Sequence, residues 1–169
     1  PITQRMAVVA DHIWEQTGVS RLKEITHHPS DTVRGWACYV VALEETFSLA
    51  KRLDAIRPHA DDPHFGVREW AWLAVRPRII TDLAPAIRQF KTWVKHPAPN
   101  IRRFAVEITR PRGVWCAHIA ALKQRPNDAL SLLETVKSDP SRYVQDSVAN
   151  WLNDASKSKP DWVRDLCKR

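Results

Sequence analysis

The chain has 169 residues, of which 44% are hydrophobic and 4 are glycine, and its formal net charge is +7. This length is enough for one domain with its own core, so we expect residues 1–169 to form a single domain, truncated at one or both ends. The sequence contains no secretory signal and no apolar run near the roughly 20 residues that a membrane span needs. The three cysteines, Cys38, Cys116 and Cys167, lack CxxC spacing, which argues against zinc and predicts a reducing, cytoplasmic setting.

Amphipathic spacing, together with glycine and proline boundaries, predicts a chain made of helices alone. The first expected helix, 3–16, ends at Gly18. Asn100 is the expected N-cap of the central helix, and Pro58, Pro77 and Pro111 are expected to end the helices before them because proline has no amide hydrogen to donate. The other expected helices span 19–27, 32–44, 46–57, 64–76, 83–95, 101–110, 115–124, 127–137, 141–155 and 160–168.

Four of these helices share a pattern that begins at a proline. Pro29, Pro63 and Pro97 are each followed by a β-branched residue four positions on, an arginine five on and an alanine eight on, and Pro140 begins a looser copy. The prolines lie 34, 34 and 43 residues apart, which indicates stacked helical pairs that bury their apolar faces against one another. The pattern resembles the inner helix of HEAT repeats, whereas the Trp/Leu-Gly/Tyr pattern of tetratricopeptide repeats is absent. We therefore expect an all-α, HEAT-like repeat superhelix (α-solenoid) with a concave basic groove.

Positive charge is concentrated in the middle of the chain. Between Arg76 and Arg112 there are nine Lys or Arg against two acidic residues, so this window carries the whole net charge. Basic side chains on a curved solenoid suit a polyanion such as DNA, because neutralising phosphates releases counterions. The alternative interpretation is a solvated basic surface without a partner.

The residues that could carry chemistry are acidic and aromatic. Glycine-rich phosphate loops, GxSxG and HExxH are all absent, and the scattered histidines predict no metal site. Successive inner helices instead place carboxylates at equivalent positions, at Glu69, Glu107 and Asp154, which we expect to converge on one groove. Carboxylates repel DNA, but they can position water or stabilise a cationic transition state, as they do in glycoside hydrolysis. The alternative is that Glu107 only pairs with Arg103 or Arg110 along its own helix.

Two strings carry a resemblance to a known family. NIRRFAVEITRPRGVW at 100–115 and DPSRYVQDSVANWLND at 139–154 resemble the paired motifs of the AlkC branch of the AlkC/AlkD alkylpurine DNA glycosylases, which are HEAT-like solenoids. The likeness covers most of the chain from about residue 28 onward. It implies removal of alkylated, cationic bases such as 3-methyladenine from double-stranded DNA by hydrolysis of the N-glycosidic bond, with no metal or organic cofactor. We expect the protein to act as a monomer.

The resemblance also implies roles for individual residues. Glu107 matches the family's active-site glutamate, and Asp154 matches the aspartate that acts on water or on the oxocarbenium ion. A further family glutamate falls at Trp72, so this chain departs from the pattern there, and Glu69, one turn earlier, is the candidate substitute. The implied catalytic residues are Asp154, Glu107 and Glu69; the lesion contacts are Trp115 and Trp72; and the DNA-binding residues are Arg76, Arg102, Arg103, Arg110 and Arg112.

Two other functions fit the same sequence. One is a non-catalytic HEAT-repeat binder of damaged, bent or branched DNA, which the departure at Trp72 favours. The other is a protein-binding scaffold, a common use of helical solenoids.

Overall fold

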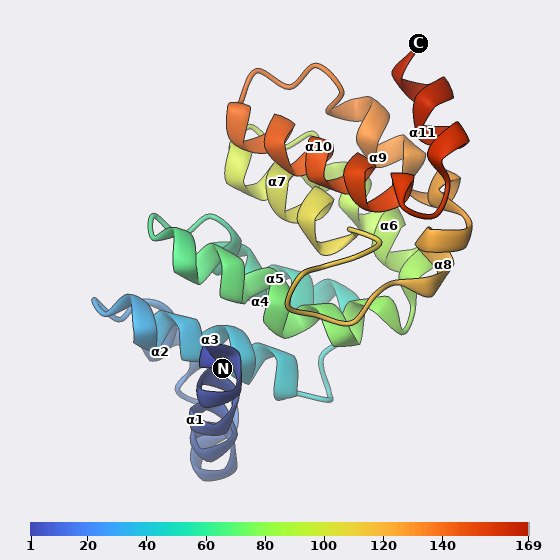
Figure 1. The fold of residues 1–169 in the computed structure, drawn as a ribbon. Coiled ribbons are helices and arrows are strands. Elements are labelled where there is room, and N and C mark those ends of the chain that lie inside the picture. Colours follow the sequence, from blue (N-terminus) through green and yellow to red (C-terminus); the bar gives the residue numbers. More distant parts are fainter. Residues whose placement is uncertain (169) are drawn as a thin grey trace. The chain divides into compact units, whose positions relative to one another are not determined.

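The computed structural model describes residues 1–168, and its regular elements within that range are eleven α-helices and one 3₁₀-helix (Figure 1). The prediction of an all-α fold is therefore confirmed. No helix among these residues is both long enough and apolar enough to cross a membrane. In chain order the elements are α1 (Ile2–Thr17), α2 (Leu22–Thr26), α3 (Asp31–Leu43), α4 (Leu49–Ala60), α5 (Phe65–Ile80), α6 (Leu83–Trp93), α7 (Pro99–Ile108), α8 (Ala120–Gln124), η1 (Pro126–Ala129), α9 (Leu130–Thr135), α10 (Arg142–Ser156) and α11 (Pro160–Cys167).

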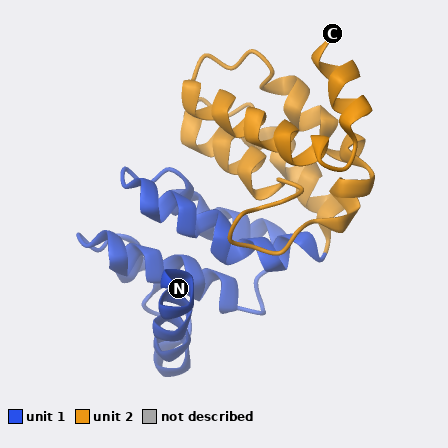
Figure 2. Cartoon of the chain, viewed as in Figure 1, with its two compact units in different colours: residues 1–81 blue, residues 82–169 orange. Residues whose placement is uncertain are grey.

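The chain divides into two compact units, Pro1–Thr81 and Asp82–Arg169 (Figure 2). We call them unit 1 and unit 2. In unit 1, α3 packs against α1, α2, α4 and α5; in unit 2, α7 packs against α6, α9 and α10, and α11 packs against α10. The single-domain organisation and the concave basic groove both remain predictions.

The proline register of the repeats is confirmed. The helices α3, α5, α7 and α10 each begin two residues after one of the four repeat prolines. The residue four positions after the proline is fully buried in three copies, at Val67, Ile101 and Val144. In unit 1 the helices α3 and α5 approach closely at Gly35, where an added Cβ would lie 2.4 Å from the Trp70 ring. The repeat pattern therefore marks the helix starts and, in three of the four copies, a core position.

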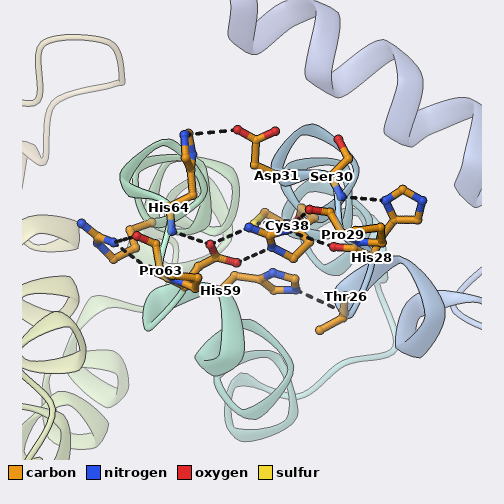
Figure 3. A network of polar contacts seen from close by, with 12 residues as sticks. Thr26, His28, Pro29, Ser30, Asp31, Cys38, His59, Pro63 and His64 are labelled. Carbon is orange, nitrogen blue, oxygen red and sulfur yellow. Dashed lines mark hydrogen bonds and ion pairs between the residues drawn. The ribbon is translucent and has the colours of Figure 1, made fainter.

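An arginine joins successive repeats within each unit, and we call this arrangement a repeat clamp. In unit 1, Arg34 Nε and Nη2 donate to the two carboxylate oxygens of Asp62, at 2.6 and 2.9 Å. Arg34 Nη1 donates to the carbonyls of His28 and Pro29, at 3.0 and 2.9 Å. Figure 3 shows this network with His28, Pro29 and Pro63 labelled. The bidentate geometry suits a guanidinium and holds the turn before α5 against α3.

Unit 2 contains the same clamp at the equivalent positions. Arg102 Nε and Nη2 donate to Asp139 at 2.6 and 2.8 Å, and Arg102 Nη1 donates to the carbonyls of His96 and Pro97 at 2.9 and 2.7 Å. The hydrogen bond from Arg102 holds the pKa of Asp139 below its usual value, against the opposing effect of burial. The arginine five positions after the proline therefore has a structural role in both units.

The residue before each repeat proline caps the turn that follows. Its side chain accepts a hydrogen bond from the amide two positions on, at 2.8 to 3.1 Å: His28 from Ser30, Asp62 from His64, His96 from Ala98 and Asp139 from Ser141. Histidine and aspartate share this capping role, but only the two aspartates also accept the bidentate arginine of a clamp.

A buried histidine in unit 1 makes stability depend on pH. His59 of α4 is 1% exposed, and its Nε2 lies 3.3 Å from Thr26 Oγ1, as Figure 3 shows. Burial lowers the pKa of His59 to about 4, whereas a histidine in an unfolded chain has a pKa near 6.5. Between these two values the unfolded state binds the additional proton, so stability is present above about pH 6.5 and is lost as the pH falls toward 4.

We expect the free energy of unfolding to fall by about 2 kcal/mol between pH 7 and pH 5 because of His59. His59→Phe should remove this share of the decrease, while His12→Phe, at an exposed position, should leave it in place. Urea unfolding at the two pH values measures the effect. An equal decrease in the parent chain and in His59→Phe would assign the pH dependence to other groups.

Several predicted helix boundaries were wrong. Pro58 and Pro77 lie inside α4 and α5 rather than ending them. Each costs one helical hydrogen bond, but the last turns continue because they bury His59 and Ile79. The helix α7 begins at Pro99 with Ala98 as its N-cap, so Asn100 lies inside it; proline suits this first position because the missing amide would be unpaired there in any case.

The expected helices at 19–27, 115–124 and 127–137 are shorter in the structure. The first is reduced to α2, and the last is divided into η1 and α9. The expected helix at 115–124 is reduced to α8, because residues 109–119 form an irregular loop. Five-residue segments such as α2 and α8 cannot maintain a helix by propensity alone, so tertiary contacts set their length.

Candidate functional site

The candidate site in unit 2 is built on α7. This helix has an apolar side on which Ile101, Phe104 and Ile108 are buried. The Phe104 ring packs against Trp93 of α6, with the ring centroids 5.0 Å apart. Because this side is fixed in the core, the position of Glu107 in the last turn is fixed as well.

Two carboxylates from different helices converge on one arginine. Glu107 of α7 accepts a hydrogen bond from Arg110 Nη1 at Oε1, at 2.6 Å, and Asp154 of α10 accepts one from Arg110 Nε at Oδ2, at 2.8 Å. Glu107 and Asp154 are 3% and 2% exposed, and the Arg110 side chain is 12% exposed. We call Glu107, Arg110 and Asp154 the carboxylate cluster. The structure thus brings together two of the three predicted catalytic residues.

Further groups surround Glu107. The Ser147 hydroxyl of α10 donates to Glu107 Oε2 at 2.6 Å, and Arg103 Nη2 lies 3.6 Å from the same oxygen. Arg103 also lies over the Tyr143 ring, 4.4 Å from its centroid. The pairing of Glu107 with Arg103 and Arg110, which was the alternative interpretation of this glutamate, is therefore present, although Arg110 lies just after the end of α7. A contact from α10 adds to it.

Ser147 was not among the predicted site residues, although its place in the repeat pattern indicates a special role. Aligned on the repeat prolines, its position holds Trp36, Trp70 and Phe104 in the other copies. A small polar residue at a position that is otherwise aromatic indicates that something polar faces it, because a buried hydroxyl needs a partner. That partner is Glu107.

The charge of the cluster is balanced by its own contacts. Burial lowers the pKa of Arg110, but the hydrogen bonds and charges of Asp154 and Glu107 together raise it by more than burial lowers it. The pKa of Arg110 therefore lies above its ordinary value, and the guanidinium stays charged. Two carboxylates against one guanidinium leave a local charge of about −1, which Arg103 offsets from the Glu107 side. A small, weakly solvated group of this kind can stabilise a positive charge brought next to it.

The loop after α7 carries Trp115. The start of the loop is fixed by Trp151 of α10, whose Nε1 donates to the Thr109 carbonyl at 3.0 Å. Its two ends are joined by a hydrogen bond from the Ile119 amide to the Pro111 carbonyl, at 3.0 Å. Trp115 itself is 80% exposed. A tryptophan exposed to this degree on an anchored loop is suited to contact a partner.

The residues predicted from α5 lie in unit 1. Trp72 is buried, and its Nε1 donates to Glu69 Oε2 at 3.0 Å. Arg76, one turn further along the helix, is buried as well. The catalytic role of Glu69, the lesion contact of Trp72 and the phosphate contact of Arg76 all remain predictions.

The predicted DNA-binding arginines of unit 2 all make contacts within the protein. Arg102 belongs to a repeat clamp, Arg110 to the carboxylate cluster, and Arg103 lies over Tyr143. Arg112 Nη2 donates to Ser158 Oγ at 2.7 Å. Their phosphate contacts remain predictions, and a change at Arg102 affects the fold in addition to any partner. No group of three or more His, Cys, Asp or Glu side chains among residues 1–168 is arranged to hold a metal ion.

Comparisons with known proteins agree with the motifs in unit 2. The model for the family of DNA alkylation repair enzymes matches residues 67–168. The uncharacterized protein YhaZ of Bacillus subtilis (strain 168) is 38% identical over 120 residues, which is 71% of this chain and 33% of that protein. This chain therefore spans about a third of the length of YhaZ.

Solved structures match over almost the whole chain. The Pseudomonas fluorescens alkylpurine DNA glycosylase AlkC, solved bound to DNA containing an abasic site analog, is 27% identical with a TM-score of 0.80 and covers 98% of this chain. The match covers 46% of the AlkC chain. AlkD2 from Streptococcus mutans is 23% identical with a TM-score of 0.79, covers 98% of this chain and 80% of its own, and supports the HEAT-like fold. With its family match over more than half of its length, this chain belongs to the family of DNA alkylation repair enzymes.

Proposed function

We propose that this chain is a DNA glycosylase that hydrolyses the N-glycosidic bond of alkylated, positively charged bases such as 3-methyladenine in double-stranded DNA. The observation that carries the proposal is the carboxylate cluster, in which Glu107 and Asp154 meet at Arg110. The family match and the likeness to AlkC, which was solved bound to DNA containing an abasic site analog, support it.

The chemistry of a cationic base suits this cluster. An alkylated purine leaves readily because it already carries positive charge, so the enzyme need not supply a strong acid to protonate it. It must stabilise the developing sugar cation and place a water molecule. Within residues 1–168 the hydrogen bond to the Asp154 carboxylate comes from Arg110 and goes to Oδ2, which leaves Oδ1 for the sugar cation or the water.

A base-release assay on the parent chain tests the proposal. Duplex DNA carrying 3-methyladenine or 7-methylguanine is incubated with the chain, and free base is measured by chromatography; unmodified duplex is the control. We expect methylated base to be released, leaving abasic sites. Tight binding to the methylated duplex without release of base would overturn the glycosylase assignment.

A second candidate function is a non-catalytic binder of damaged, bent or branched DNA. Trp72 occupies the position where the resemblance places a glutamate. Its indole donates a hydrogen bond to Glu69, the candidate substitute for that glutamate. A binder of this kind would shift branched or bent duplexes in a salt-dependent manner and release no base. The base-release assay therefore separates the two functions.

We propose that Trp115 contacts the lesion, and that Arg112, one of the predicted DNA-binding arginines, holds a phosphate. Because Trp115 is 80% exposed, Trp115→Ala should change the free energy of unfolding by less than about 0.5 kcal/mol. It should weaken binding to methylated DNA about tenfold, since stacking of a base on an aromatic ring contributes about 1 to 3 kcal/mol.

Fluorescence anisotropy with labelled methylated duplex measures the effect of Trp115→Ala. Val114→Ala is the matched control, because Val114 is the neighbouring residue and is also largely exposed. If both variants bind as tightly as the parent chain, Trp115 has no part in recognition.

A further inference from the structure

Arg110 contacts the two carboxylates through separate nitrogens. Nη1 donates to Glu107, and Nε donates to Asp154. These two nitrogens lie on different edges of the planar guanidinium, so one rigid group sets the position of both carboxylates. Glu107 and Asp154 are 47 residues apart in the sequence, on α7 and α10, and Arg110 therefore links the two helices at the candidate site.

The surroundings of Arg110 do not favour a phosphate contact. Its side chain is 12% exposed, and two of its nitrogens donate to buried carboxylates at 2.6 and 2.8 Å. A phosphate would have to approach a guanidinium that is already paired with two anions, and the repulsion from those anions would reduce any gain.

We propose that Arg110 is a positioning residue that holds Glu107 and Asp154 together in one orientation, rather than a contact to the DNA backbone. This inference rests on the proposed function, because positioning has a purpose only if the carboxylates act on the sugar cation or on water. Ser147 supports the same arrangement by donating to the second oxygen of Glu107.

Further charged and titratable groups lie beside the pair. On α7, Arg103 lies 3.6 Å from Glu107, and on α10 the Tyr143 ring lies under Arg103. If Arg110 loses its charge, Arg103 still compensates Glu107 but does not compensate Asp154. The two buried carboxylates would then repel each other without a bridging cation between them.

Two variants at Arg110 separate positioning from phosphate binding. Arg110→Gln removes the charge, and we expect the acid limb of the base-release profile to move to higher pH, because two adjacent carboxylates then repel each other. Arg110→Lys keeps the charge but cannot bridge both carboxylates, so the profile should keep its position while base release falls about tenfold or more.

The salt dependence of DNA binding provides the contrast. Loss of a phosphate contact lowers the slope of log affinity against log salt by about one. We expect Arg110→Gln to leave this slope unchanged. Arg112→Gln, in the adjacent loop and outside the carboxylate cluster, tests the predicted phosphate contact of Arg112 and should lower the slope without moving the pH profile. Arg142→Gln, at an exposed position on α10, should change neither quantity.

The outcomes are distinct. If Arg110→Gln lowers the salt slope by about one and the pH profile of base release does not move, Arg110 is a phosphate contact and our inference is wrong. If Arg110→Gln fails to fold, Arg110→Lys still decides, because lysine replaces arginine well at a phosphate but not between two carboxylates. If the parent chain releases no base, the proposed function fails, whereas the salt slope of Arg110→Gln still shows whether Arg110 contacts a phosphate.

Discussion

Replacing Asp154 by asparagine is expected to lower the rate of base release at least about 100-fold, the usual cost of removing one group that stabilises charge in a transition state. Asparagine keeps the shape of the side chain and can still accept the hydrogen bond from Arg110 Nε, so the cluster should remain assembled. What is lost is the negative charge that faces the developing sugar cation. The effect should therefore fall on the chemical step rather than on DNA binding.

Single-turnover base release measures the chemical step of Asp154→Asn, and anisotropy measures DNA binding separately. Asp146→Asn is the matched control, because Asp146 lies on the same helix but is exposed and pairs with Arg142. The control should release base as fast as the parent chain. Equal rates for Asp154→Asn and the parent would show that this carboxylate does not act in the reaction.

The second large effect is on stability and concerns the repeat clamp of unit 2. Arg102→Met is expected to lower the free energy of unfolding by about 3 kcal/mol or more, because it leaves the buried Asp139 carboxylate without its partner. Two backbone carbonyls, of His96 and Pro97, also lose their donor. Methionine keeps most of the length and apolar area of the side chain, so the loss reflects the polar contacts.

Urea unfolding at pH 7 measures the contribution of the clamp to the free energy of unfolding. Arg142→Met is its control, because the pair of Arg142 and Asp146 is exposed, at 84% and 53%, and such pairs contribute less than about 1 kcal/mol. The contribution of Asp139 should also depend on pH. Its pKa is lowered in the folded state, so the contribution is present above the unfolded value near 4 and is lost as the pH falls through the folded value. If Arg102→Met lowers the free energy of unfolding no more than Arg142→Met does, the clamp is dispensable for stability.

The architecture was largely predictable because it depends on local and periodic features. Helices are recognised by the spacing of apolar residues, and repeats are recognised by a recurring sequence pattern. The four prolines therefore located the starts of α3, α5, α7 and α10, each two residues downstream. Boundaries set by burial were not predictable in this way. Pro58 and Pro77 lie within helices because the turns after them bury apolar or neutral side chains in the core.

The candidate site was predictable in part. The choice of Glu107 and Asp154 came from the resemblance of two strings to a known family, and the structure brings both carboxylates to Arg110. The phosphate contacts of the arginines stay predictions, because charge alone does not distinguish a partner within the protein from one outside it. Arg102 makes four hydrogen bonds in the clamp, and nothing in the order of residues shows that Asp139 accepts two of them.

By itself, the sequence determined the helical class, the repeat register and the residues with suitable chemistry, because these follow from neighbours one or two turns apart and from recurring patterns. Only the tertiary structure decided which charges meet. Arg110 reaches Asp154 across 44 positions, and Ser147 reaches Glu107 across 40. Contacts over such separations depend on how α10 packs against α7, since side-chain hydrogen bonds form only within about 3 Å.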